Sequence, residues 1–207
     1  MANNIQKIEP PALPLAPGMY DQGYQDQSNN VLRLFFNRLI SMLRNVLSTD
    51  DGGKFLYFPR GLFYSTTNQT AAATSTGYPV EFENTYLGNG VSIEGVDATR
   101  LTVSADGVYN FQVTLGIQHT NASDATVWVW INKNGTDVPY GGQKQSLKGN
   151  GDKSVYWNFS IDLTAGQYIE MYWATSDTDL SLHTEAATSP HPGVPSAIVA
   201  VSFVSNL

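Results

Sequence analysis

The histidines and two acidic residues are the side chains of this sequence whose chemistry suits metal binding. His119, His183 and His191 share no spacing that is typical of a metal site, so we expect loop or surface histidines. Asp177 and Asp179 are separated by one residue, as in a calcium loop, but the glycine and the distal glutamate of such a loop are missing. We therefore interpret this segment as a solvated turn.

Two groups of glycines flank a polar segment that contains Lys144 and Lys148, at positions 141–142 and 149–151. A phosphate-binding loop places its glycines before a helix, and no helical pattern follows here. We interpret them as hairpin glycines. An enzyme would need a nucleophile with its base, a carboxylate pair or a metal cluster, and the sequence shows none at a recognisable spacing. We expect a protein that is not an enzyme and has no cofactor.

Trp128 and Trp130 offer a different chemistry, the stacking of flat rings. In the segment 126–131, Val127, Val129 and Ile131 alternate with the two tryptophans, so both faces of the strand are apolar. Such a strand is typical of central burial, a subunit interface or a stacking surface for sugars. We favour the interface, because a chain without cysteines gains stability by self-association.

Alternation with a period of two predicts the strands that position these residues. It is clearest in residues 107–117, 155–163 and 169–173, each of which places apolar side chains on one face. About ten short strands are expected from residue 61 onward: 62–67, 78–83, 90–93, 99–104, 108–118, 125–132, 154–163, 167–175, 180–185 and 196–204. The dipeptide Asn134-Gly135 is a strong signal for a β-hairpin turn. This pattern predicts a β-sandwich or jelly roll.

An amphipathic helix is predicted from about Tyr20 to Leu47. One apolar row contains Leu32, Phe35, Leu39, Met42 and Val46, and a second contains Phe36, Ile40, Leu43 and Leu47. Ser28 or Asn29 is the expected N-cap. Arg33, Arg38 and Arg44 lie on the polar side. We rank an interfacial membrane helix below a helix that docks on its own domain or bundles with its copies.

A proline-rich arm precedes this helix. Pro11, Pro14 and Pro17 recur every third residue, which places them on one edge of a polyproline II helix. A disordered tail is the alternative, but Leu13 and Leu15 make the segment more apolar than a solvated linker. We favour an arm that orders against a partner. The expected organisation is an arm over residues 1–19, a helix and extended connector over 20–60 and a jelly roll over 61–207.

Charge is unevenly distributed along the chain. Residues 1–60 hold six Lys/Arg against five Asp/Glu, and residues 61–207 hold five against thirteen. An acidic body repels phosphate backbones, so we expect no nucleic-acid partner. The sequence shows no run long and apolar enough for a membrane span and no secretory signal, so we expect synthesis in a cytosol.

Three ordered motifs resemble strand signatures of the C1q/TNF-like jelly-roll family over about residues 62–207. They are Asp106-Gly-Val-Tyr-Asn-Phe, Val127-Trp-Val-Trp-Ile-Asn-Lys-Asn-Gly135 and Leu163-Thr-Ala-Gly-Gln-Tyr-Ile-Glu-Met-Tyr-Trp173. The resemblance implies an all-β, ten-stranded jelly roll that forms a homotrimer with aromatic and aliphatic residues at its centre. Candidates for the trimer interface or core are Phe111, Val113, Trp128, Trp130, Trp157, Phe159, Met171, Trp173 and Phe203. A signal peptide and collagen stalk are missing, which argues against secreted signalling.

The order of arm, helix and jelly roll resembles small virion proteins of tailed bacteriophages, which implies a structural role in a particle assembled in the host cytoplasm. The leading hypothesis is a trimeric capsid decoration, or cement, protein. Its expected anchoring residues are Pro11, Leu13, Pro14, Leu15, Pro17, Leu32, Arg33, Phe35, Phe36, Arg38 and Leu39. The alternative is a tail-fibre or head-fibre tip that binds host glycans through Trp128, Trp130 or Tyr140. A metal held by histidines on the threefold axis stays an open alternative.

Overall fold

The computed structural model describes residues 11–15, 17–47 and 58–207. The chain divides into two compact units, Met1–Tyr57 and Phe58–Leu207, which are described separately. Residues 1–10 and 16 of the expected arm, and residues 48–57 of the expected helix and connector, lie outside the described residues.

The first unit contains one helix, α1 (Gln22–Leu47), as the two apolar rows predict. It begins at Gln22, close to the expected start at about Tyr20, but Ser28 and Asn29 lie inside the helix, so the prediction of an N-cap at either residue is wrong. Asp21 caps the helix instead, since its Oδ1 atom accepts the backbone N–H of Gly23 at 2.8 Å and of Tyr24 at 3.4 Å. Capping by a short carboxylate satisfies N–H groups that have no partner within the helix.

Replacement of Asp21 with alanine should destabilise the first turn of α1 by about 1 kcal/mol, because these two N–H groups lose their acceptor. Hydrogen exchange of the Gly23 and Tyr24 amides measures this directly, and exchange should become several-fold faster. Ser28→Ala is the matched control, because Ser28 lies within the helix and should leave the exchange of both amides unchanged. Equal effects of the two substitutions would rule out Asp21 as the cap.

The described part of the arm has no helix or strand. The hydroxyl of Tyr24 donates to the carbonyl oxygen of Pro14 at 3.2 Å, which fixes this part of the arm to the helix. Leu13 and Leu15 remain exposed beside it. The arm therefore presents apolar side chains that α1 does not cover.

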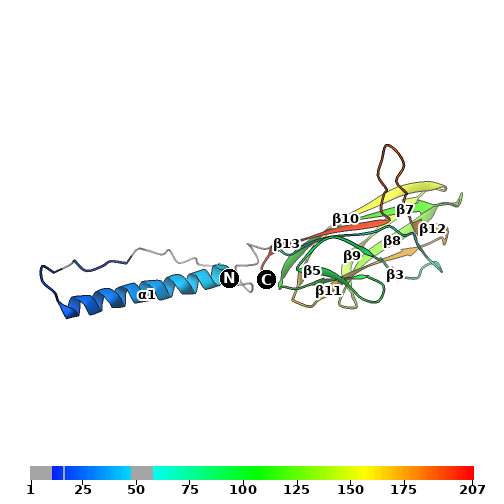
Figure 1. Ribbon diagram of the computed structural model, residues 1–207. Helices are drawn as coiled ribbons and strands as arrows, with labels where there is room; N and C mark the ends of the chain where they lie inside the picture. Colours follow the sequence, from blue (N-terminus) through cyan, green and yellow to red (C-terminus); the bar gives the residue numbers. More distant parts are fainter. Residues whose placement is uncertain (1–10, 16, 48–57) are drawn as a thin grey trace. The chain divides into compact units, whose positions relative to one another are not determined.

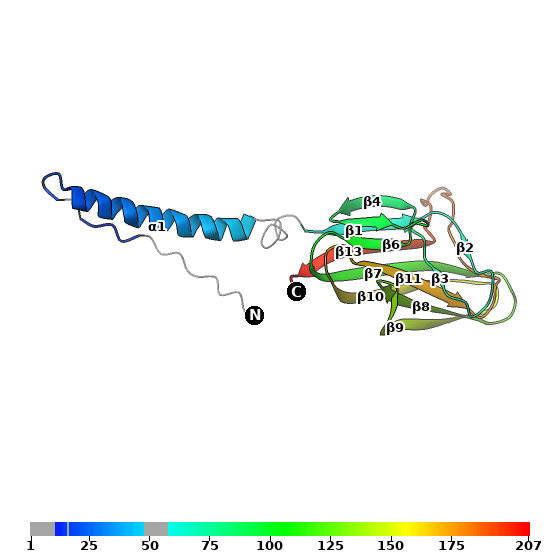
Figure 2. The same ribbon diagram turned by 90° about the horizontal axis from the view of Figure 1, so that it is seen from below.

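The second unit consists of strands in two sheets that pack face to face (Figures 1 and 2). The strands are β1 (Arg60–Ser65), β2 (Gln69–Thr70), β3 (Tyr78–Pro79), β4 (Asn84–Asn89), β5 (Val91–Glu94), β6 (Arg100–Val103), β7 (Gly107–His119), β8 (Ala125–Lys133), β9 (Thr136–Leu147), β10 (Gly151–Leu163), β11 (Tyr168–Thr175), β12 (Leu180–Leu182) and β13 (Ala197–Ser205).

The strand order confirms the predicted jelly roll. The first sheet has the order β2-β12-β7-β13-β1-β4, with β10 on the other side of β7, and the second has the order β5-β6-β11-β8-β9, with β3 beside β11. All pairings between these strands are antiparallel. The chain crosses from one sheet to the other between β6 and β7, between β7 and β8, and between β9 and β10, as in a double Greek key.

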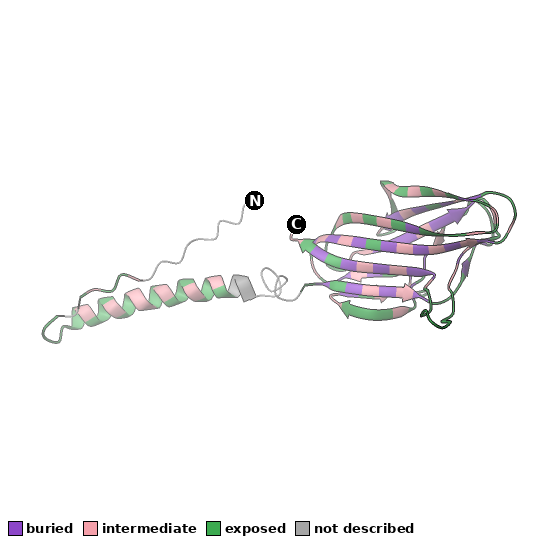
Figure 3. Ribbon diagram, turned by 90° about the horizontal axis from the view of Figure 1, so that it is seen from above, coloured by how far each residue is buried: buried purple, intermediate pink, exposed green. Residues whose placement is uncertain are grey.

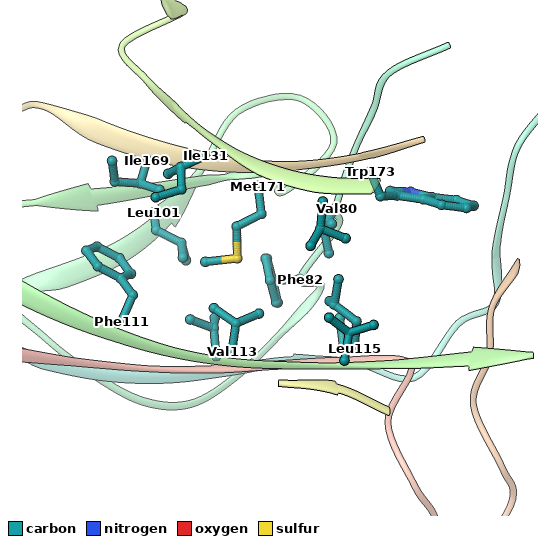
Figure 4. Packing of buried hydrophobic residues seen from close by; sticks show 14 of the residues in the cluster. Val80, Phe82, Leu101, Phe111, Val113, Leu115, Ile131, Ile169, Met171 and Trp173 are labelled. Atoms are coloured by element: carbon teal, nitrogen blue, oxygen red, sulfur yellow. The ribbon is translucent and has the colours of Figure 1, made fainter. Parts of the chain in front are cut away.

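The core lies between the sheets and is built by alternate residues of the long strands. Along β7, inward residues such as Phe111 and Leu115 are buried while their neighbours are more exposed, which produces the banding in Figure 3. Met171 and Trp173 of β11 point toward this face from the opposite sheet (Figure 4). Burial of these apolar side chains is the main source of stability for a chain without disulfides.

Three strands were not predicted, the two-residue strand β2 and two longer strands that lack an apolar alternation. β9 occupies the segment that we interpreted as a polar loop around Lys144, and β4 lies at an edge of the first sheet. Both are edge strands, where polar side chains are favoured because they discourage pairing with other chains. The hairpin signal was correct: β8 and β9 are joined at Asn134 and Gly135, which have φ of 50° and 81°.

Candidate functional site: surfaces that the sandwich leaves uncovered

The expected set of interface or core residues separates into a buried group and an accessible group. Phe111, Val113, Met171, Trp173 and Phe203 belong to the buried core of the single chain. In the folded chain these side chains fill the space between the two sheets. Trp157, Phe159, Trp128 and Trp130 are accessible, and they lie on two different surfaces.

The first surface is an open edge of the sandwich, formed where β9 and β10 end their sheets without pairing with each other. Trp157 and Phe159 of β10 are half-buried there, with ring centroids 5.0 Å apart. Phe159 stacks on Phe111 in the core, again with 5.0 Å between ring centroids. A hydrogen bond of 3.0 Å from Gln143 Nε2 to the carbonyl oxygen of Tyr156 links the two edges. We call this surface the open edge.

The outer face of the first sheet adjoins the open edge. An open depression of about 570 Å³ lies on it, lined by apolar and polar side chains: Leu62, Gln112, Val113, Thr114, Tyr156, Trp157, Asn158, Ile198 and Ala200. Tyr156 projects from this face and is largely exposed. The mixture of apolar and uncharged polar groups is typical of a surface that another protein chain can cover.

The second surface lies on the outer face of the second sheet. There Trp130 of β8 stacks on Tyr172 of β11, with ring centroids 5.7 Å apart and 25° between the planes. The indole Nε1 of Trp130 donates to Asp137 Oδ1 at 2.9 Å. Gly77 approaches the far edge of the ring so closely that a Cβ atom there would lie 3.0 Å from Trp130. The ring of Trp130 is therefore held on several sides.

Trp128 lies two residues before Trp130 on β8, faces the same outer side of the sheet and is 36% exposed. Its neighbours across the sheet are Ala174 on β11 and Lys144 on β9, and Lys144 Nζ lies 5.8 Å from the centroid of the indole ring. Gly142 is opposite Trp130, and the absence of a side chain there leaves a depression of about 340 Å³ beside the two tryptophans. We name Trp128, Trp130 and Tyr172 the aromatic platform.

A bulge in β9 borders the aromatic platform. Asn132 pairs with Asp137 and Trp130 pairs with Gly142, so residues 138–141 bulge opposite a single residue of β8. Tyr140 sits in this bulge with a φ of 59° and a fully exposed side chain. A non-glycine residue in the left-handed region is strained, and such strain is often found at functional sites. The sequence suggested Tyr140 as a stacking residue but gave no sign of the bulge.

Tyr172 completes the aromatic platform, and it is the ring that was not predicted from the sequence. Burial, together with the nearby carboxylates of Glu170 and Asp137, raises the pKa of Tyr172. The phenol is therefore protonated at neutral pH and available as a hydrogen-bond donor. Its alternation with Met171 and Trp173 is the signal that could have placed it on the outer face.

The histidines occupy separate environments, and the expectation of a surface position is wrong for His119. It is buried at the end of β7, with Nε2 3.2 Å from Asp177 Oδ2. His191 is exposed, and His183 is half-buried. Within residues 11–15, 17–47 and 58–207, no group of three or more His, Asp or Glu is placed to hold a metal ion.

Asp177 organises the turn between β11 and β12. Its side chain accepts the backbone N–H of Asp179 at 3.0 Å and the Ser123 hydroxyl at 3.3 Å. The hydrogen bond from the Asp179 backbone, with smaller effects of His119 and Ser123, lowers the pKa of Asp177. This carboxylate therefore holds two loops together, which agrees with a structural turn.

The helix α1 carries an apolar row that the first unit leaves exposed. Leu32, Phe35 and Leu39 are half-buried within the first unit. The neighbouring row remains exposed, with 52% of Phe36, 55% of Ile40 and 46% of Leu43 accessible. Arg38 is exposed, and the Arg33 guanidinium donates from Nη2 to Asn30 Oδ1 at 2.9 Å. Among the described residues, no helix has the length and apolar character needed to cross a membrane.

No family model and no curated protein matches this sequence. Among solved structures, the chain is similar to one described as the structure of Eiger TNF from S. frugiperda. The two chains are 8% identical, the match covers 73% of this chain and 95% of that chain, and the TM-score is 0.47. The strand order of the two sheets is what defines this chain as a jelly roll.

Proposed function

We propose that this chain is a structural virion protein of a tailed bacteriophage, a homotrimeric capsid decoration protein. Its arm and helix fasten it to the shell, and its jelly roll forms the exposed body. The observation that carries the proposal is the uncovered apolar row of α1, at Phe36, Ile40 and Leu43. The protein functions in the virion after assembly in the host cytoplasm, without a cofactor, nucleic acid or membrane.

The helix needs a partner because an isolated amphipathic helix is marginally stable in water. At 26 residues α1 is about 39 Å long, and one side of it carries the exposed apolar row. Leu13 and Leu15 of the arm add further exposed apolar area. Shell subunits, together with the helices of two sister chains, would cover this surface.

The jelly roll has complementary surfaces for a trimer. In the proposed arrangement, the open edge of one copy, with Trp157 and Phe159, packs on the outer face of the first sheet of the next copy. Each copy uses two different surfaces, and a rotation of one third of a turn closes the ring. The acidic body supports an exposed role, because residues 61–207 carry all of the excess negative charge of the chain.

A tail-fibre or head-fibre tip that binds host glycans is the second candidate. It would use the same trimer, with residues 1–50 as the segment attached to the fibre. The aromatic platform favours this candidate, since it is an accessible stacking surface on the opposite sheet from the proposed trimer contact.

Deletion of residues 1–19 should abolish binding to the particle and leave the trimer intact. Three arms on one trimer bind together, so their simultaneous removal eliminates an avidity gain of about 10²–10⁴. The measurement is co-sedimentation of purified protein with undecorated particles of the phage that encodes the chain, with the oligomeric state followed by light scattering.

The double substitution Leu13→Ser and Leu15→Ser should reproduce most of this loss, because both side chains are exposed on the arm. Asn29→Ser, at an exposed polar position of α1, is the matched control and should bind like the unaltered chain. A truncated trimer that still saturates the particles would refute the anchoring role of the arm.

A further inference from the structure

We propose that the aromatic platform is a binding site for neutral glycans, in which a hexopyranose ring stacks on Trp128 beside Trp130 and its hydroxyls bond to polar groups of β9. This inference rests on the second candidate function, the binding of host glycans, and names its ligand class; the site itself does not depend on how the chain is anchored or assembled. It rests on the exposure and fixation of the rings, on the polar groups beside them and on the charge of the surface.

The aromatic rings are exposed on a rigid support. Trp128 and Trp130 lie on consecutive outward positions of β8, which is paired on both sides by β9 and β11. Stacking on Tyr172 and the hydrogen bond to Asp137 fix Trp130 before any ligand arrives. The C–H groups on one face of a pyranose ring carry partial positive charge, and they are attracted to the negative face of an indole ring. A fixed ring loses little conformational entropy when it binds.

The space beside the rings has the size of a short sugar segment. Small residues adjoin each tryptophan, since Ala174 is opposite Trp128 and Gly142 is opposite Trp130. The depression of about 340 Å³, which Trp128, Trp130 and Gly142 help to line, is at the lower end of the range for small-molecule sites. It suits one or two hexose rings better than a protein segment, because it is shallow and bordered by the bulge with Tyr140.

Polar groups suited to hydroxyls surround the depression. Asp137 Oδ1 accepts from Trp130 Nε1 at 2.9 Å and from Asn132 Nδ2 at 3.2 Å. Within the described part of the chain, Asp137 Oδ2 makes no hydrogen bond, so it can accept from a sugar hydroxyl. Lys144 Nζ lies over the Trp128 ring, 5.8 Å from its centroid, and supplies three N–H donors. A carboxylate and an ammonium group around aromatic rings match the alternating donors and acceptors of a sugar.

Charge selects neutral over anionic glycans. Asp137 borders the site, and residues 61–207 carry an excess of acidic side chains. Arg100 near Tyr172 is paired with Glu170 at 3.4 Å, so its charge is offset. A uronic or sulfated chain would be repelled by the acidic surface of the jelly roll. A neutral hexose chain avoids this repulsion and keeps all the stacking and hydrogen-bonding contacts.

The test is an array of neutral and acidic glycans probed with the full-length protein, followed by fluorescence titration with the neutral oligosaccharide that binds best. Trp128→Ala should weaken binding at least about tenfold, the expected loss for one stacking contact. Trp128→Phe should recover part of the affinity, because it restores an aromatic face. Tyr86→Ala is the matched control: Tyr86 is an exposed aromatic residue on β4 of the other sheet, and its loss should leave binding unchanged.

Thermal unfolding and light scattering of every variant separate a lost contact from a lost fold or oligomer. Trp128 is partly exposed, so Trp128→Ala should unfold close to the temperature of the unaltered chain. The inference is overturned if the unaltered protein binds no neutral hexose glycan, if it binds acidic glycans only, or if Trp128→Ala binds as tightly. Because no particle is needed, these outcomes are distinct from a failure of capsid attachment.

Discussion

Replacement of Phe111 with alanine should lower the free energy of unfolding by about 3–5 kcal/mol, the range for truncating a buried aromatic ring. Phe111 is completely buried on β7 and stacks face to face on Phe159, with 5.0 Å between ring centroids. Its removal leaves a cavity between the sheets that the paired strands on either side cannot close. Urea denaturation, followed by tryptophan fluorescence at a fixed protein concentration, measures the change.

The matched control is Tyr86→Ala, which removes an exposed aromatic side chain from the same sheet. It should change the free energy of unfolding by no more than about 0.5 kcal/mol, as is usual for surface positions. A loss below about 1 kcal/mol for Phe111→Ala would mean that the sandwich is not packed around this ring. Fixed concentration matters because unfolding of an oligomer depends on it.

The long strands could be predicted from sequence because their burial has a period of two. In β7 the residues Tyr109, Phe111 and Val113 alternate with polar neighbours, and the structure buries each of them. The β8–β9 turn was predictable for a different reason, since Asn134 and Gly135 adopt the positive φ that a tight hairpin requires. Both signals are local, and neither depends on which strands become neighbours.

The distinction between core and surface aromatics could not be predicted, because it depends on sheet order. Phe111 on β7 and Phe159 on β10 both occupy inward positions, and the antiparallel pairing of these two strands places them opposite each other. Phe111 is covered because β7 lies in the middle of the sheet. Phe159 is only half-buried because β10 lies at an edge. The alternation in the sequence is the same for both strands.

The candidate glycan site was predicted only in part. Trp128 and Trp130 were evident from the apolar character of both faces of β8. Tyr172 belongs to a distant strand, and its stacking on Trp130 depends on the pairing of β8 with β11. Asp137 reaches the indole of Trp130 only because the β9 bulge follows it. Tertiary pairing and an irregular strand, which have no local sequence signal here, complete the site.

Introduction of a charge at the open edge should dissociate the proposed trimer. Trp157 is half-buried on β10, and in the trimer it would be covered by the next copy. Trp157→Glu would then bury a carboxylate without a partner, which costs about 3–5 kcal/mol. The dissociation constant of the trimer should rise at least about hundredfold. Sedimentation equilibrium should detect about 68 kDa for the unaltered protein, three times the 22.6 kDa of one chain, and a shift toward the single-chain mass for the variant.

Val96→Glu is the matched control, because Val96 is a fully exposed apolar residue outside the open edge. It adds the same charge and should leave the trimer unchanged. A Trp157→Glu protein that remains trimeric would show that the open edge is not the contact, and that α1 or another face of the jelly roll holds the copies together. If the unaltered chain is itself a single subunit at micromolar concentration, the trimer proposal fails, because the apolar edge and the row on α1 then persist without a partner.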